Sequence, residues 1–260
     1  MRNFLFTIRF CGTGYHGFQV QQNAVTVCQV FQDAVESLLG RRWPVKGCSR
    51  TDAGVHANRY CLSMQVEEAV TIGCDAMVRA LNVRLPGDIA VLDCREVPRD
   101  FHARYDCKGK RYRYLIHNSA IRDPFLEGRA HRVATAKPLD HLLMDEAARG
   151  FLGTHDFSAF CATGGSVQDK VRAIYSASVA REGQTVCFQV TGNGFLYNMV
   201  RIMAGTLLDV GLGRTAPQEI GGIIASGDRS RAGVTLPACG LYLDEVFYRP
   251  PTAPAPLQGE

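Results

Sequence analysis

The stretch VCQVFQDAVESLL, residues 27–39, is the element on which the fold class depends. Its apolar side chains recur at helical spacing and form one stripe, and Gly40 follows as a stop signal. Strand-like segments lie on both sides of it: residues 3–10 before it, then 45–49 and 59–66 after it. Strands and helices mixed in this order predict an α+β domain.

The same order of elements continues along the chain. A short helix is expected over 74–81, a turn over 82–87 and a strand over 89–97. The resulting order of strand, helix, strand, strand, helix, strand is typical of the ferredoxin-like split arrangement. The second half repeats it with insertions, with strands over 112–117, 173–180, 185–192 and 241–248 and helices over 139–151, 196–212 and 217–225.

We therefore predict an α+β fold of two ferredoxin-like halves, residues 1–104 and 105–249. The two halves are expected to form one extended mixed antiparallel sheet, with helices on one face and a central binding cleft. Residues 250–260 are rich in proline and poor in apolar side chains, which predicts a loose tail.

Composition narrows the class of protein. The net charge of +4 and pI of about 8.5 permit a polyanionic partner without requiring one. The ten cysteines are scattered and form no CxxC pair, so a metal site and a disulfide framework are both disfavoured and a cytoplasmic location fits better. We expect no membrane association, because the sequence has no long apolar run.

The polar stretch 47–57, Gly-Cys-Ser-Arg-Thr-Asp-Ala-Gly-Val-His-Ala, follows a strand and has the residue types of a functional loop. Asp52 is its carboxylate and the first candidate for chemistry. An aspartate before Ala-Gly is equally typical of a helix cap or a turn. The loop alone leaves both interpretations open.

A second loop, 12–17, is rich in glycine and resembles a phosphate cradle only superficially. Its sequence GTGYHG lacks the lysine and the hydroxyl residue of a P-loop, so a nucleotide-binding function is disfavoured. The amide side chains that follow it suit bases and sugar hydroxyls better; they are Gln19, Gln21, Gln22 and Asn23.

Residues 108–114, KGKRYRY, combine basic and aromatic side chains. In a strand, Tyr112 and Tyr114 share one face and Arg111 and Arg113 the other. Charge for phosphates and flat rings for unstacked bases are typical of single-stranded nucleic-acid binding. The alternative is a solvated charged edge strand whose tyrosines pack on the core.

Arg201 lies in an otherwise apolar helical segment, and the residues three and four positions away are not acidic. A buried guanidinium is costly without a carboxylate, so an acid from elsewhere in the chain is expected, and Asp52 is our choice. The alternative is an arginine at the helix edge that extends to water.

These segments together resemble the TruA family of tRNA pseudouridine synthases, which modify the anticodon stem-loop at tRNA positions 38–40. The resemblance covers nearly the whole chain and rests on residues 47–57, on Asn82 with 85–89 (LPGDI), on 101–104 with 112–114, and on 193–196 with 199–201 and Gly205. One departure is the segment Gly17-Phe18-Gln19-Val20-Gln21, where the family usually has tryptophan in place of Phe18 and often a basic residue in place of Val20.

The resemblance implies roles for individual residues. Asp52 matches the aspartate that starts the isomerisation of uridine, Tyr112 the tyrosine that stacks on the target base, and Arg201 the basic residue that pairs with the aspartate. Arg50 matches an arginine that helps to expel the target nucleotide. Basic residues for RNA binding are then Arg104, Lys110 and Arg111.

The reaction that the family catalyses needs no metal, nucleotide or other cofactor, and the family resemblance also implies a homodimer that acts on tRNA in the cytoplasm. Two alternatives remain open: a non-catalytic RNA-binding or tRNA-folding module on the same scaffold, and a pseudouridine synthase that acts on a different RNA. Asp52, Tyr112 and Arg201 occurring together favour the enzyme, because binding alone would not need all three.

Overall fold

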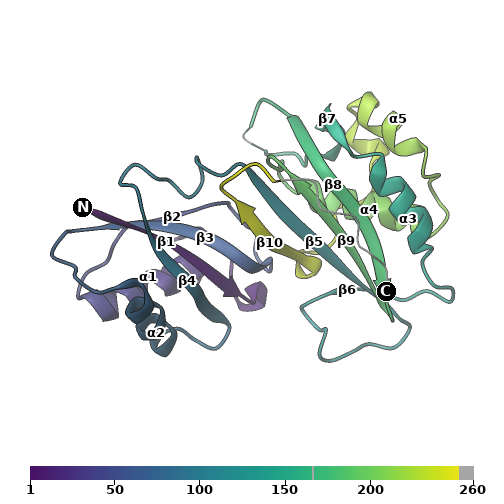
Figure 1. Ribbon diagram of the computed structural model, residues 1–260. Coiled ribbons are helices and arrows are strands. Elements are labelled where there is room, and N and C mark those ends of the chain that lie inside the picture. The colour runs from purple at the N-terminus through teal and green to yellow at the C-terminus, as the bar shows by residue number, and fades with distance from the viewer. Residues whose placement is uncertain (166, 252–260) are drawn as a thin grey trace, which may run out of the picture. The chain divides into compact units, whose positions relative to one another are not determined.

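The computed structural model describes residues 1–165 and 167–251, which pack as two compact units (Figure 1). The first unit contains Met1–Cys107 and Tyr242–Tyr248, and the second contains Lys108–Leu241 and the residues from Arg249 onward. Residues 242–248 of the predicted strand 241–248, which the sequence-based division places in the second half, are grouped here with the first unit. From residue 252 on, the predicted proline-rich tail lies outside the described residues.

The sheet of the first unit is built around β3 (His56–Val66). β1 (Arg2–Phe10) pairs with β3 and with β4 (Ile89–Val97), in both cases antiparallel. β2 (Val45–Gly47) lies antiparallel to β3, and β10 (Leu241–Phe247) lies parallel to its first residues. The order β4-β1-β3-β2 is that of a ferredoxin-like domain, so the predicted fold class is confirmed in this unit.

Two helices cover one face of this sheet, α1 (Val27–Leu39) and α2 (Cys74–Arg84) (Figure 1). Thr26 caps α1, since its Oγ1 accepts a hydrogen bond from the backbone N–H of Gln29 at 3.3 Å. Gly40 ends the helix with a left-handed φ of 70°. The apolar stripe of α1 faces the sheet, where Phe31 packs edge-on against Phe6 with ring centroids 5.5 Å apart.

The sheet of the second unit has the antiparallel order β5-β9-β8-β7, and β6 lies parallel to β5. Its strands are β5 (Gly109–Asn118), β6 (His131–Val133), β7 (Gly153–Asp156), β8 (Val171–Glu182) and β9 (Thr185–Gly192). The strands β5, β9 and β8 correspond to strands 1, 3 and 2 of the ferredoxin-like order, as predicted.

The helices of the second unit are α3 (His141–Arg149), α4 (Met199–Gly211) and α5 (Glu219–Ser226). α3 packs against β8 and α4, and nearly every residue of α4 is buried. Aromatic residues fill the core beneath the helices, where Phe151 meets Phe160 edge-on with ring centroids 5.2 Å apart. Among the described residues, no helix has the length and apolar character to cross a membrane.

Several element boundaries differ from the sequence-based prediction. α2 continues to Arg84, so Asn82 is helical and not part of a turn; its side chain pairs with both backbone groups of Val91, each at 2.8 Å. α4 begins at Met199, three residues later than predicted. The short strands β6 and β7 were not predicted, because three or four residues are too few to show an alternating pattern.

Candidate active site

The loop that carries Asp52 leaves β2 and returns to β3 in the first unit, and its first residues are fixed to β3. The N–H of Cys48 donates to the carbonyl of Cys61 at 2.9 Å. The Tyr60 hydroxyl donates to the carbonyl of Ser49 and accepts from the N–H of the same residue. Tyr60 is itself held by stacking on Phe18, with ring centroids 4.2 Å apart.

The glycine-rich loop packs directly against this catalytic-loop candidate. The N–H of Gly54 donates to the carbonyl of Tyr15 at 3.2 Å, and the N–H of Phe18 donates to that of Thr51 at 3.4 Å. A Cβ on Gly12 would lie 2.0 Å from the carbonyl oxygen of Val55, and one on Gly17 would lie 2.2 Å from that of Thr51. These glycines therefore allow the backbones of the two loops to approach closely, and the glycine-rich loop supports the Asp52 loop.

The same glycine-rich loop borders an open hollow of about 590 Å³. Its polar lining side chains are His16, Gln21, Gln22, Asn23, Gln29 and Arg42. Amides beside an open hollow agree with the prediction that this segment contacts RNA bases and sugars, which stays a prediction.

Asp52 is half-buried, and its carbonyl accepts the N–H of Val55 at 3.2 Å, which closes a tight turn. Arg50 is exposed on the same loop. His56 is buried: its Nδ1 accepts the N–H of Gly12 at 3.0 Å, and its ring stacks on Tyr242 at 4.5 Å. His56 thus orders the loop, and Asp52 remains the candidate for chemistry in it.

A second compact turn in the first unit presents Arg104 to solvent. The N–H of His102 donates to the Asp106 carboxylate at 2.7 Å, and the N–H of Arg104 donates to Nδ1 of His102 at 3.0 Å. Burial lowers the pKa of His102 below its ordinary value, and the positive charge of nearby Lys46 lowers this pKa further. The exposed ring of Tyr105 lies 4.3 Å from the His102 ring.

In the second unit, β5 has the two-faced pattern that was predicted. Tyr112 and Tyr114 are buried, and Arg111 on the opposite face donates from Nε to the Thr191 hydroxyl at 3.3 Å. Tyr114 is a core residue: its hydroxyl donates to the carbonyl of Pro237 at 2.7 Å, and burial raises its pKa. Tyr112 is 6% exposed, with its ring edge-on to Phe195 at 5.1 Å.

Arg201 lies in the first turn of α4 and is half-buried. Its Nε donates to the carbonyl of Leu236 at 2.7 Å, and its Nη1 donates to Oδ1 of Asn198 at 2.8 Å. The segment that carries Leu236 is pressed against α4, since a Cβ on Gly205 would lie 2.0 Å from the carbonyl oxygen of Val234.

The sequence-predicted residues thus fall into two sets. Asp52 and Arg50 share one loop of the first unit, and Arg104 lies on another turn of that unit. The second set lies in the second unit: Lys110, Arg111 and Tyr112 on β5, and Arg201 on α4. Sequence reasoning missed Asn198 as a partner of Arg201, and no local signal pointed to it, because the predicted helix 196–212 placed Asn198 inside the helix and not immediately before it.

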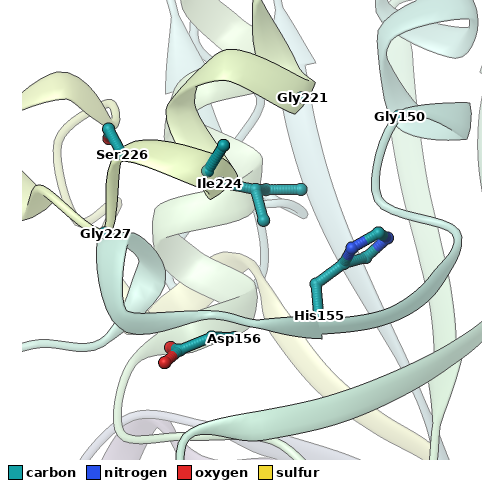
Figure 2. A pocket seen from close by; sticks show the side chains of 8 residues that line it. Gly150, His155, Asp156, Gly221, Ile224, Ser226 and Gly227 are labelled. Atoms are coloured by element: carbon teal, nitrogen blue, oxygen red, sulfur yellow. The ribbon is translucent and has the colours of Figure 1, made fainter.

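The second unit also contains a cavity of about 330 Å³ beside α5 and β7 (Figure 2). His155 and Asp156 line one side of it, and Ile224 and Ser226 line the other. His155 bonds the Leu152 carbonyl through Nε2 at 2.7 Å, and Asp156 accepts both polar hydrogens of Ser158. The predicted site residues do not line this cavity, so it is separate from the candidate active site.

Comparison with known proteins shows which family the chain belongs to. The family model described as tRNA pseudouridine synthase matches residues 7–106 and 147–249. The chain belongs to this family. Tyr112 and its basic neighbours lie between the two matched ranges, whereas Asp52 and Arg201 lie within them.

Curated relatives agree with this assignment to the pseudouridine synthases, which are isomerases. Proteins named tRNA pseudouridine synthase A from Ruminiclostridium cellulolyticum and Acetivibrio thermocellus are 47% and 48% identical to this chain, over 95% of it and 100% of each relative. The protein of that name from Exiguobacterium sibiricum is 45% identical over 95% of this chain and 97% of the relative. Among solved structures, one titled as a Cbf5-Nop10-Gar1 complex is 12% identical, with a TM-score of 0.35, over 91% of this chain and 47% of that chain.

Proposed function

We propose that this chain converts uridine to pseudouridine in the anticodon stem-loop of tRNA, and that Asp52 initiates the reaction. The observation that carries the proposal is the Asp52 loop itself. It is held by hydrogen bonds to the glycine-rich loop and to Tyr60, and Asp52 is half-buried in it. A reactive group on a rigid support is the arrangement that catalysis requires.

The chemistry is an isomerisation, so atoms and electrons balance without a co-reactant. The bond between N1 of uracil and C1′ of ribose breaks, the base turns, a bond forms between C5 and C1′, and the C5 proton moves to N1. Asp52 starts this sequence as a nucleophile or as a base. The detached uracil has only to be held while it rotates, and Tyr112 is the flat side chain proposed to stack on it.

The remaining proposed roles are those of positively charged side chains. Arg201 is proposed to pair with the Asp52 carboxylate and keep it ionised. Arg50 is proposed to occupy the space that the target nucleotide leaves in the stem. Arg104, Lys110 and Arg111 are proposed to contact phosphates, which fits the exposed position of Arg104 and the mildly basic net charge.

We further propose that the enzyme works in the cytoplasm as a homodimer. The ten cysteines are all free thiols, which supports a reducing compartment. The homodimer rests on the resemblance to the family, and the molar mass in solution, compared with 28.5 kDa for one chain, tests it.

The variant Asp52→Asn tests the central assignment. It keeps the shape of the side chain and removes its charge, so we expect pseudouridine formation to be abolished and tRNA affinity to stay nearly unchanged. The measurement is tritium release from C5-labelled tRNA together with filter binding. Asp93→Asn, an exposed aspartate on β4, is the matched control and should remain active.

Two results would overturn the proposal. Turnover by Asp52→Asn would contradict the initiating role of the carboxylate. Wild-type protein that binds tRNA without forming pseudouridine would favour the alternative of a non-catalytic RNA-binding module, and activity confined to a different RNA would contradict the substrate assignment.

A further inference from the structure

Asn198, the residue before α4, has a backbone conformation that glycine otherwise occupies. Its φ and ψ are 59° and 8°, and within residues 1–165 and 167–251 it is the only residue other than glycine with a positive φ. This left-handed region is unfavourable for an L-residue, although asparagine tolerates it better than most. An observed strain of this kind suggests a functional constraint.

The side chain of Asn198 is also used in an unusual way for its position. A residue that caps the N-terminus of a helix usually accepts a hydrogen bond from a backbone N–H of the first turn. In the described structure Asn198 makes no such bond, and its Oδ1 accepts from Nη1 of Arg201 at 2.8 Å. The accepting atom must be the amide oxygen, because a guanidinium can only donate.

A second acceptor fixes the same guanidinium from another edge. The Nε of Arg201 donates to the carbonyl of Leu236 at 2.7 Å. The segment before Leu236 is anchored on α4, where the N–H of Gly233 donates to the Thr206 hydroxyl at 2.9 Å. Acceptors at Nε and at Nη1 together set the plane of the group, and so the direction of its remaining N–H bonds.

We propose that Asn198 is a positioning residue, which holds the Arg201 guanidinium in the orientation needed to pair with the catalytic carboxylate. The inference rests on the proposed function, in which Arg201 pairs with Asp52. Asn198 acts through Arg201 and does not touch the substrate. Its strained backbone and its unused capping ability are both explained by this single contact.

The variant Asn198→Gly separates the side chain from the backbone, because glycine adopts the left-handed conformation readily and lacks the amide. We expect kcat for pseudouridine formation to fall about tenfold, as for the loss of one hydrogen bond to a charged group, with KM for tRNA and the thermal midpoint unchanged. In an Arg201→Ala background the same change should have no further effect on kcat.

Asp140→Ala is the matched control, at the N-terminus of another helix of the same unit. Asp140 caps α3 in the ordinary way, since its Oδ1 accepts the N–H groups of Leu142 and Leu143, each at 3.1 Å. Its loss should lower the thermal midpoint and leave kcat at the wild-type value, the reverse of the result expected for Asn198→Gly.

A wild-type kcat for Asn198→Gly, or a loss that adds fully to that of Arg201→Ala, would overturn the positioning role. Failure of the proposed function would look different, because the wild-type protein itself would then form no pseudouridine. An Arg201→Ala variant with the wild-type kcat would contradict the role of Arg201 and this inference together, and would leave the role of Asp52 intact.

Discussion

At the scale of single residues, Gly12 shows how little room separates the two loops of the first unit. A Cβ at this position would lie 2.0 Å from the carbonyl oxygen of Val55, well inside contact distance. We expect Gly12→Ala to lower the free energy of unfolding by about 1–3 kcal/mol and to reduce kcat, because the backbone of the Asp52 loop must shift. Urea denaturation and pseudouridine formation measure the two effects.

Gly14→Ala is the control for this prediction, since a Cβ on Gly14 would meet nothing within 4 Å. Its stability should stay the same or rise by up to about 1 kcal/mol, because alanine restricts the unfolded chain. Equal effects of the two substitutions would show that the close approach of Gly12 to Val55 does not matter.

At the scale of elements, α4 and α5 contain glycines for different reasons. Gly205 of α4 faces the carbonyl of Val234 at a distance that excludes a side chain, whereas a Cβ on Gly222 of α5 would meet nothing within 4 Å. We expect Gly205→Ala to lower the thermal midpoint and Gly222→Ala to raise stability by about 0.5–1 kcal/mol through helix propensity. Thermal unfolding of both variants tests this, and stabilisation by Gly205→Ala would contradict the packing described for α4.

The elements also show what the sequence could and could not predict. The helix 27–39 was predicted to the residue, because its apolar stripe and its terminal glycine agree, and the structure adds Thr26 as its cap. Asn82 was assigned to a turn that contains Pro86, whereas its pairing with Val91 is a tertiary contact that no local pattern reveals. Asp52 was proposed because its neighbours in sequence are unusual, whereas the contact of Asn198 with Arg201 and its positive φ are visible only in three dimensions.

At the scale of the whole molecule, the basic net charge of +4 agrees with binding to tRNA phosphates, so the affinity for tRNA should fall as the salt concentration rises. Each phosphate contact releases a counterion, so log K should fall with log salt concentration by roughly 0.7–0.9 for every contact. Filter binding of tRNA between low and physiological salt measures the slope. Arg104→Ala should reduce the steepness of this slope by roughly 0.7–0.9, the value for one contact. A flat salt dependence of the wild-type protein would contradict electrostatic RNA binding.

The grouping of β10 with the first unit has a consequence for how the chain is made. Tyr242 pairs with His56 and stacks on its ring, and Tyr248 donates to the carbonyl of Ala103 at 3.0 Å. The first unit is therefore complete only after residues 242–248 have emerged from the ribosome. Until then the start of β3, which leads directly from the Asp52 loop, lacks β10 as a neighbour, so nascent chains should acquire a fully ordered Asp52 loop only after residues 242–248 have been synthesised.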